Sequence, residues 1–243
     1  MKIAFLLLAV ALSSSALSSR AAADDSFNTG IAAAQSGDFS AAATAFEAAT
    51  KQQPSAGAYV NLGLAEWQRG HAGAAILAWE RARWMDPFAA QAVQNLKFAR
   101  TVAQLDDPPL KWFETASTWL PPNAWVWLAG ANLWLAIGAL VLPRFFRWRK
   151  SGWQQWLAAL CGGAFLFCLT ANVGVVSRTD IGFVLRRNAP LLLTPTKAGE
   201  PVSTLNAGEA ARRLKTRGDY YFIRTAYGSG WIDRRDFGLV SAE

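Results

Sequence analysis

Apolar residues gather in three uninterrupted blocks, and the sequence between these blocks is patterned and charged. The blocks cover residues 3–12, 124–142 and 156–176. The second and third contain no charged residue and would be about 28 and 31 Å long as helices, close to the hydrocarbon thickness of about 30 Å. We therefore predict two transmembrane helices, 124–142 and 156–176, and not two buried helices of a soluble protein.

The first block is too short to span a bilayer and has the order of a secretory signal. Lys2 precedes the apolar residues 3–12, and three alanines precede the acidic pair Asp24-Asp25. This order predicts a signal peptide over 1–23 with a cleavage site among small residues. The alternative is an uncleaved N-terminal anchor, and in both cases the residues that follow are exported.

The segment between the two predicted spans is strongly basic. Residues 143–155 contain Arg144, Arg147, Arg149 and Lys150 and no acidic residue. Short loops rich in arginine and lysine remain in the cytoplasm. Both flanking regions are then expected in the periplasm or at the cell exterior, and the protein in a bacterial inner membrane. Because residues 24–107 hold 9 acidic and 6 basic residues, the net charge of +7 does not indicate a nucleic-acid-binding face.

Both predicted spans carry a stripe of small and weakly polar residues, which favours close packing of the two helices. No ionisable side chain accompanies these stripes, so an ion path is not indicated. Pro143 is expected to end the first span. The stripes are Ala129, Asn132, Ala136 and Ala139 in the first span, and Ala158, Cys161, Gly162, Cys168 and Asn172 in the second.

Residues 24–105 contain an internal repeat with an offset of 33 residues. The alignment superposes FNTGIAAAQSGDFSAAATAFEAATKQQP on VNLGLAEWQRGHAGAAILAWERARWMDP. The spacing of glycine, alanine, an aromatic residue and proline resembles tetratricopeptide repeats, which pair two helices in each repeat. A third helix, Ala90 to Arg100, is expected to cap the stack.

Asn28, Asn61 and Asn95 occupy equivalent positions that commonly face the groove of tetratricopeptide repeats. Two interpretations remain open: the amides bind a ligand, or they tie neighbouring helices together. Trp67 completes the candidate partner-binding groove, and apolar neighbours such as Leu64 favour an apolar or mixed ligand. Residues 106–123 then form an amphipathic juxtamembrane segment on the outer leaflet or, alternatively, a plain linker.

Residues 177–243 change to short apolar runs separated by turn residues, which predicts a small barrel of five or six strands. The runs are GFVLR, PLLLTP, PVSTL, AARRLK, YYFIRTA and GWIDR. The last hairpin, ending in Gly-Trp-Ile, resembles bacterial SH3-like domains. A candidate binding groove would contain Tyr220, Tyr221, Tyr227 and Trp231, although core packing of Tyr221 and Trp231 is the competing interpretation. The nearby basic residues Arg212, Arg213, Lys215 and Arg217 either contact anionic headgroups or form a solvated strand edge.

The order of these parts resembles that of BatE proteins of bacterial aerotolerance operons. The fold class is a multidomain membrane protein with an all-α repeat domain, a two-helix transmembrane hairpin and a small all-β SH3-like barrel. The resemblance implies partners among von Willebrand factor A-domain membrane proteins and, indirectly, a MoxR-type ATPase. The chain has a single histidine and none of the common catalytic motifs.

We therefore expect a protein that is not an enzyme and uses no cofactor or metal. Its expected function is that of a scaffold or adaptor with protein-interaction domains outside the cytoplasm. The alternative function is a tether to, or sensor of, peptidoglycan through the SH3-like domain.

Overall fold

The computed structural model describes residues 22–145 and 152–241, which form two compact units. The first unit joins the chain up to Asp107 with the chain from Ile181 onward, and the second is Pro108–Asp180. Most of the predicted signal peptide, and the three loop residues Arg147, Arg149 and Lys150, lie outside the described residues.

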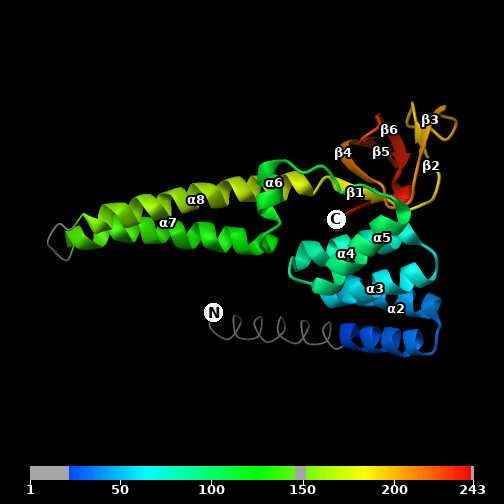
Figure 1. The fold of residues 1–243 in the computed structure, drawn as a ribbon, viewed down its shortest axis with the longest axis horizontal. Helices are drawn as coiled ribbons and strands as arrows, with labels where there is room; N and C mark the ends of the chain where they lie inside the picture. Colours follow the sequence, from blue (N-terminus) through cyan, green and yellow to red (C-terminus); the bar gives the residue numbers. More distant parts are fainter. Residues whose placement is uncertain (1–21, 146–151, 242–243) are drawn as a thin grey trace, which may run out of the picture. The chain divides into compact units, whose positions relative to one another are not determined.

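The first unit begins with five consecutive helices that stack side by side (Figure 1). Residues 22–35 form the first, followed by α2 (Phe39–Gln52), α3 (Ala56–Gln68), α4 (Ala72–Met85) and α5 (Ala90–Ala103). Asp38 and Ser55 begin α2 and α3 because their side chains accept hydrogen bonds from the backbone N–H groups of Ala41 and Ala58. Helix α5 runs three residues beyond the predicted end at Arg100.

Glycine at equivalent positions of the first two helix pairs lets the paired helices approach closely. A Cβ atom on Gly30 would lie 2.6 Å from the Phe46 ring, and one on Gly63 would lie 2.3 Å from Nε1 of Trp79. Phe46 and Trp79 are each 1% exposed. The turns that join each pair contain Gly37 and Gly70, both with φ of 80°. The 33-residue offset therefore reflects two copies of one packing arrangement.

A buried charge cluster connects α4 to α5 and the segment after it. The Glu80 carboxylate, 4% exposed, is paired with Arg100 and, at 2.9 Å, with Arg83. Arg100 is also paired with Asp107. Burying Glu80 is tolerable because two guanidinium groups satisfy its charge.

Seven antiparallel strands complete the first unit. Each of the six predicted apolar runs corresponds to one of the first six strands. They are β1 (Ile181–Val184), β2 (Ala189–Leu192), β3 (Pro201–Leu205), β4 (Ala210–Arg217), β5 (Tyr220–Arg224), β6 (Ser229–Asp233) and β7 (Phe237–Leu239). Their order in the sheet is β3-β2-β6-β5-β4-β1-β7. The last strand, which follows a short 3-10 turn (Arg234–Asp236), was not predicted.

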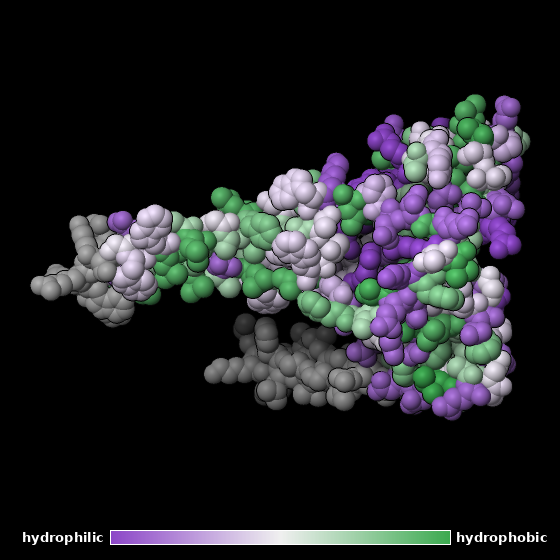
Figure 2. Space-filling view, viewed as in Figure 1, coloured by the Kyte–Doolittle hydropathy of each residue, from purple (hydrophilic) through white to green (hydrophobic). Residues whose placement is uncertain are grey.

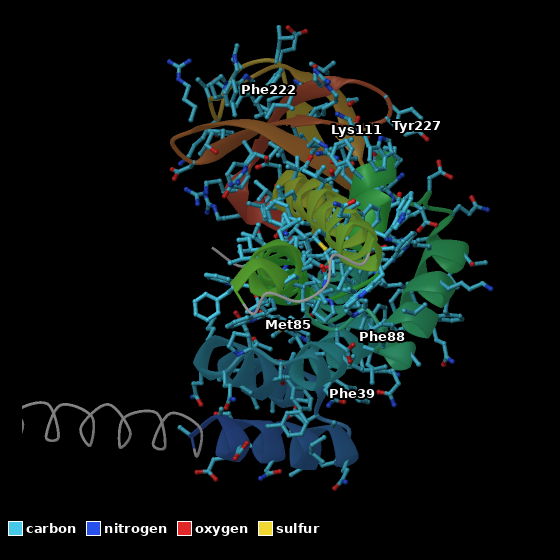
Figure 3. The ribbon with its side chains drawn as sticks, turned by 90° about the vertical axis from the view of Figure 1, so that its left-hand side faces the viewer. Phe39, Met85, Phe88, Lys111, Phe222 and Tyr227 are labelled. Carbon is cyan, nitrogen blue, oxygen red and sulfur yellow. The ribbon has the colours of Figure 1, made fainter. Side chains whose placement is uncertain are left out.

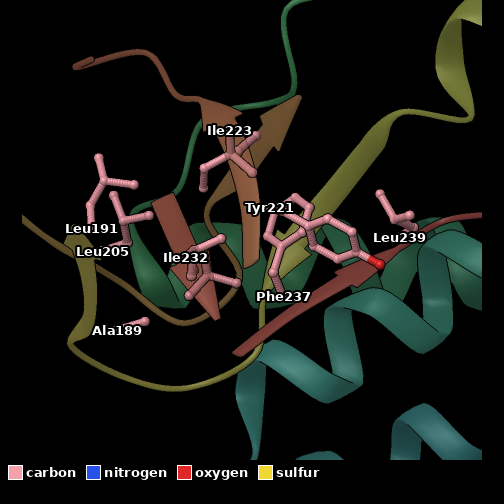
Figure 4. Close-up of a cluster of buried hydrophobic side chains, with 10 residues drawn as sticks. Ala189, Leu191, Leu205, Tyr221, Ile223, Ile232, Phe237 and Leu239 are labelled. Carbon is pink, nitrogen blue, oxygen red and sulfur yellow. The ribbon is translucent and has the colours of Figure 1, made fainter. Parts of the chain in front are cut away.

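Alternate side chains of the strands meet in one apolar core (Figure 4). Ile223 on β5 and Ile232 on β6 are fully buried, and the Tyr221 ring packs edge-on against Phe237 with centroids 6.1 Å apart. The core therefore joins the two ends of the strand order, because it contains Leu205 of β3 and Phe237 of β7.

The sheet packs directly on α4 of the helical stack. A Cβ atom on Gly73 would lie 2.4 Å from the carbonyl oxygen of Val184, and one on Gly238 would lie 2.2 Å from Cδ2 of Leu77. The guanidinium of Arg81 donates to the carbonyl oxygen of Leu239 from both Nε and Nη2. The segments predicted as domains 24–105 and 177–243 thus contact each other, which their sequences did not indicate.

The second unit contains the short helix α6 (Trp112–Ser117) and two long helices, α7 (Pro122–Phe145) and α8 (Trp153–Arg178). Helix α7 was predicted to end at Pro143, but it continues through this proline to Phe145. Both long helices are long and apolar enough to cross a membrane, and only 11% and 22% of their most apolar stretches are buried. Large apolar side chains cover their visible surface (Figure 2). A helix in the core of a soluble protein would instead bury such residues.

The two long helices pack through part of the predicted small-residue stripes. Ala129 of α7 lies in one cluster with Cys168 and Ala171 of α8. The two asparagines of these stripes bond within their own helices: Asn132 donates to the carbonyl of Leu128 at 2.8 Å, and Asn172 to that of Cys168 at 2.9 Å. Neither amide therefore holds the two helices together.

Helix α6 is fixed to α8 by buried polar groups. The carboxylate of Glu114 is fully buried and accepts hydrogen bonds from the hydroxyl of Ser177 and the backbone N–H of Lys111. Arg178 donates to the hydroxyl of Ser117 at 3.1 Å. In the sequence, Glu114 is merely a charge that cancels Lys111, but in the structure it positions the residues preceding the first long helix.

Candidate partner-binding surface

The first helix of each pair and α5 carry equivalent residues at a spacing of three. An asparagine is followed by an apolar residue one helical turn later: Asn28 and Ile31, Asn61 and Leu64, Asn95 and Phe98. A spacing of three places both side chains of each pair on the same face of the helix. We define the first-helix face as these six residues together with Trp67.

The asparagine amides of this face have no hydrogen-bond partner among the residues that the structure describes. Asn28 is exposed, while Asn61 and Asn95 are partly exposed. An amide that tied two helices together would be bonded to the neighbouring helix. Of the two interpretations left open by the sequence, this geometry favours amides that remain available to a ligand.

Three aromatic rings support the apolar part of the face. Trp67 contacts Trp79 with centroids 5.9 Å apart and Phe98 with centroids 5.8 Å apart. The contact between Trp67 and Phe98 joins α3 directly to α5, so these two first-position helices share one surface. Leu64 and Phe98 are 42% and 58% exposed. Phe98 was not among the predicted groove residues, although its spacing from Asn95 matches that of Leu64 from Asn61.

The model of the tetratricopeptide repeat family matches residues 27–92. This match contains both glycine–aromatic contacts and most of the first-helix face. No curated protein matches the chain. Residues 27–92 therefore form a tetratricopeptide-like helical region, and repeats of this kind suggest a role in protein interaction.

The structure does not gather the four aromatic residues predicted as an SH3-like groove. Tyr221 is 4% exposed and faces the core, with the guanidinium groups of Arg213 and Arg234 at 5.5 and 5.0 Å from its ring centroid. Trp231 lies on the opposite face of the sheet, beside Phe222. Tyr227 is 84% exposed in the turn between β5 and β6 (Figure 3).

Among the described residues of the first unit, burial perturbs the pKa values of Arg81 and Glu209. Desolvation lowers the pKa of the Arg81 guanidinium, while Tyr59 and Glu47 act in the opposite direction. Desolvation raises the pKa of Glu209, and the backbone N–H of Asn206 acts against that effect. Neither group belongs to a cluster of potential metal ligands, because the described part of the chain contains no group of three or more such side chains.

Proposed function

We propose that this chain is a membrane-anchored adaptor without catalytic activity that binds a partner protein through its first-helix face. The observation that supports this proposal most directly is that asparagine amides without hydrogen-bond partners lie next to the exposed Leu64 and Phe98. An extended or helical segment of a partner can accept hydrogen bonds from the amides and donate hydrogen bonds to them, while its apolar side chains cover these two residues. Tetratricopeptide repeats elsewhere use such surfaces for protein interaction.

The proposed anchor is the α7–α8 hairpin, with both soluble parts on the same side of the membrane. The contact between α4 and the sheet supports this arrangement, because residues 22–107 and 181–241 can pack together only if the chain returns to the side it left. Two spans achieve that return. The basic residues of the 143–155 loop then favour the cytoplasm for the loop and the periplasm or exterior for the packed unit.

The resemblance to BatE proteins extends this proposal to the partner. Envelope proteins with von Willebrand factor A domains, working with a MoxR-type ATPase, are the partners it implies. The seven short antiparallel strands, with Gly230-Trp231-Ile232 in β6, support an SH3-like assignment for the sheet. With Tyr221 in the core, the aromatic positions give less support to the alternative role as a peptidoglycan tether.

Site-specific crosslinking in cells tests the proposal directly. A photoreactive residue at position 64 should give a defined protein adduct, whereas one at the exposed Gln52 of α2 should not. Adding Asn61→Ala should reduce the adduct about threefold to tenfold, which corresponds to a lost hydrogen bond of about 0.5–1.5 kcal/mol. The thermal unfolding of the purified protein should not change. Equal adducts from positions 64 and 52, or unfolding caused by Asn61→Ala, would contradict the proposal.

A further inference from the structure

The hairpin β4–β5 carries the densest positive charge of the sheet. Residues 210–224 contain five basic side chains and one acidic side chain, Asp219. Lys215, Arg217 and Arg224 are exposed, and no carboxylate pairs with them among the described residues.

Aromatic side chains lie among these basic residues on the same face of the sheet. Because Tyr221 and Ile223 face the core, Tyr220 and Phe222 point to the other side. Phe222 stands opposite Lys215 on β4 and opposite Trp231 on β6. The rings of Phe222 and Trp231 have centroids 5.1 Å apart.

The strand register gives this hairpin a defined direction. Ile181, the first residue of β1, pairs with Arg212 in antiparallel orientation. Strand β4 continues to Arg217, so the hairpin extends about 16 Å beyond the start of β1, on the side from which the chain enters the sheet. Thr179 and Asp180 alone separate β1 from the end of α8 at Arg178.

We propose that this basic–aromatic surface (Lys215, Arg217, Arg224, Tyr220, Phe222 and Trp231) binds anionic lipid headgroups of the membrane that holds α7 and α8. Lysine and arginine attract phosphate groups at an anionic surface, and tryptophan and tyrosine favour the interface between headgroups and hydrocarbon. The short connection to α8 keeps the surface at high effective concentration near the bilayer. Charge and tether together favour lipid over an acidic cell-wall polymer.

The inference rests on the proposed membrane insertion, so the experiment measures insertion separately. The full chain carrying Ser229→Cys, an exposed position that stands opposite Arg224 on the proposed surface, is labelled with a membrane-impermeant, environment-sensitive maleimide. Both native cysteines lie buried in α8, away from this reagent. The protein is reconstituted into vesicles of phosphatidylcholine alone or with about a third phosphatidylglycerol. Flotation reports insertion, and the emission of the label reports contact with the bilayer.

We expect a blue-shifted emission only in the vesicles that contain phosphatidylglycerol, reversed at high salt because exposed charges are screened. The pair Lys215→Gln and Arg217→Gln should weaken this contact about fivefold for each charge removed. The matched pair Arg187→Gln and Lys197→Gln, on exposed loop residues, removes the same charge and should leave the emission unchanged.

Three results would overturn the inference. The emission could be equal in both lipid mixtures, the two pairs of substitutions could act equally, or purified cell wall could shift the emission of the protein in phosphatidylcholine while phosphatidylglycerol does not. A chain that fails to float with either vesicle contradicts membrane insertion itself, and thereby also this inference. Thermal unfolding of each variant confirms that the sheet remains folded.

Discussion

The guanidinium of Arg81 donates two hydrogen bonds to the carbonyl oxygen of Leu239, 158 residues later in the chain, at 3.1 Å from Nε and 2.9 Å from Nη2. The same guanidinium lies 6.0 Å from the centroid of the Tyr59 ring. One side chain of α4 therefore contacts both the preceding helix and the last strand of the sheet.

Replacement of Arg81 should loosen the sheet from the repeats. Arg81→Ala removes a charged donor to a partly buried carbonyl, which is expected to cost about 1.5–3 kcal/mol of unfolding free energy. Hydrogen exchange should increase in β7 more than in α2. The control is Lys51→Ala, whose exposed pair with Glu47 should contribute less than about 1 kcal/mol. Equal effects of the two substitutions would show that the Arg81 contact does not stabilise the unit.

Two glycines of α3 give a matched test of the repeat packing. Gly63→Ala places a methyl group against the buried Trp79 ring and should destabilise the unit by about 1–3 kcal/mol. Gly57→Ala, in the same helix, meets nothing within 4 Å and should be neutral or stabilising by up to about 1 kcal/mol. Denaturant unfolding of both variants measures the difference. If Gly63→Ala is as well tolerated as Gly57→Ala, close helix approach at this position is not required.

Glu209 makes the stability of the sheet depend on pH. Because burial raises its pKa, the folded state favours the protonated form, and the carboxyl contributes most stability at low pH. That contribution decreases as the pH rises through the unfolded value, about 4.3, and past the raised folded value. Glu209→Gln keeps an acceptor for Asn206 and removes the ionisation. As the pH rises from 4 to 7, the melting temperature of this variant should therefore increase relative to that of the unsubstituted protein. A difference in melting temperature that stays constant over this range would contradict the explanation.

The predicted topology can be measured with fused reporters. A reporter that is active only outside the cytoplasm should work when fused after Glu243 and should fail when fused at Ser151, because the basic loop is expected in the cytoplasm. A reporter that is active inside should give the reverse pattern. Activity of the exported reporter at position 151 would place the packed unit in the cytoplasm.

Sequence periodicity predicted the elements that depend on local pattern. The 33-residue offset predicted the helix pairs because Gly63 and Trp79 belong to one repeat and recur as Gly30 and Phe46. The six apolar runs predicted strands because each run is short and is separated from the next by turn residues.

The sequence did not predict contacts between distant segments. Nothing near Arg81 indicates an acceptor 158 residues away, and the apolar residues Ile76 and Leu77 are ordinary for a buried repeat helix. The sequence also did not indicate that Glu114 is buried, because a carboxylate in a short amphipathic segment is usually solvated. For the candidate site, spacing located the asparagines, but only the structure showed their amides without partners and Phe98 beside Trp67.

The packing of the last strands on α4 also orders the biogenesis of this protein. The ribosome makes the repeats first, yet residues near Gly208 and Gly238 pack against Ile76 and Leu77 of α4. Those residues emerge after the α7–α8 hairpin has been synthesised. A chain arrested before that point, or inserted with a single crossing, would leave this apolar surface open to proteases and chaperones. Under the proposed two-span topology, the contact between the last strands and α4 therefore forms after both α7 and α8 have been inserted.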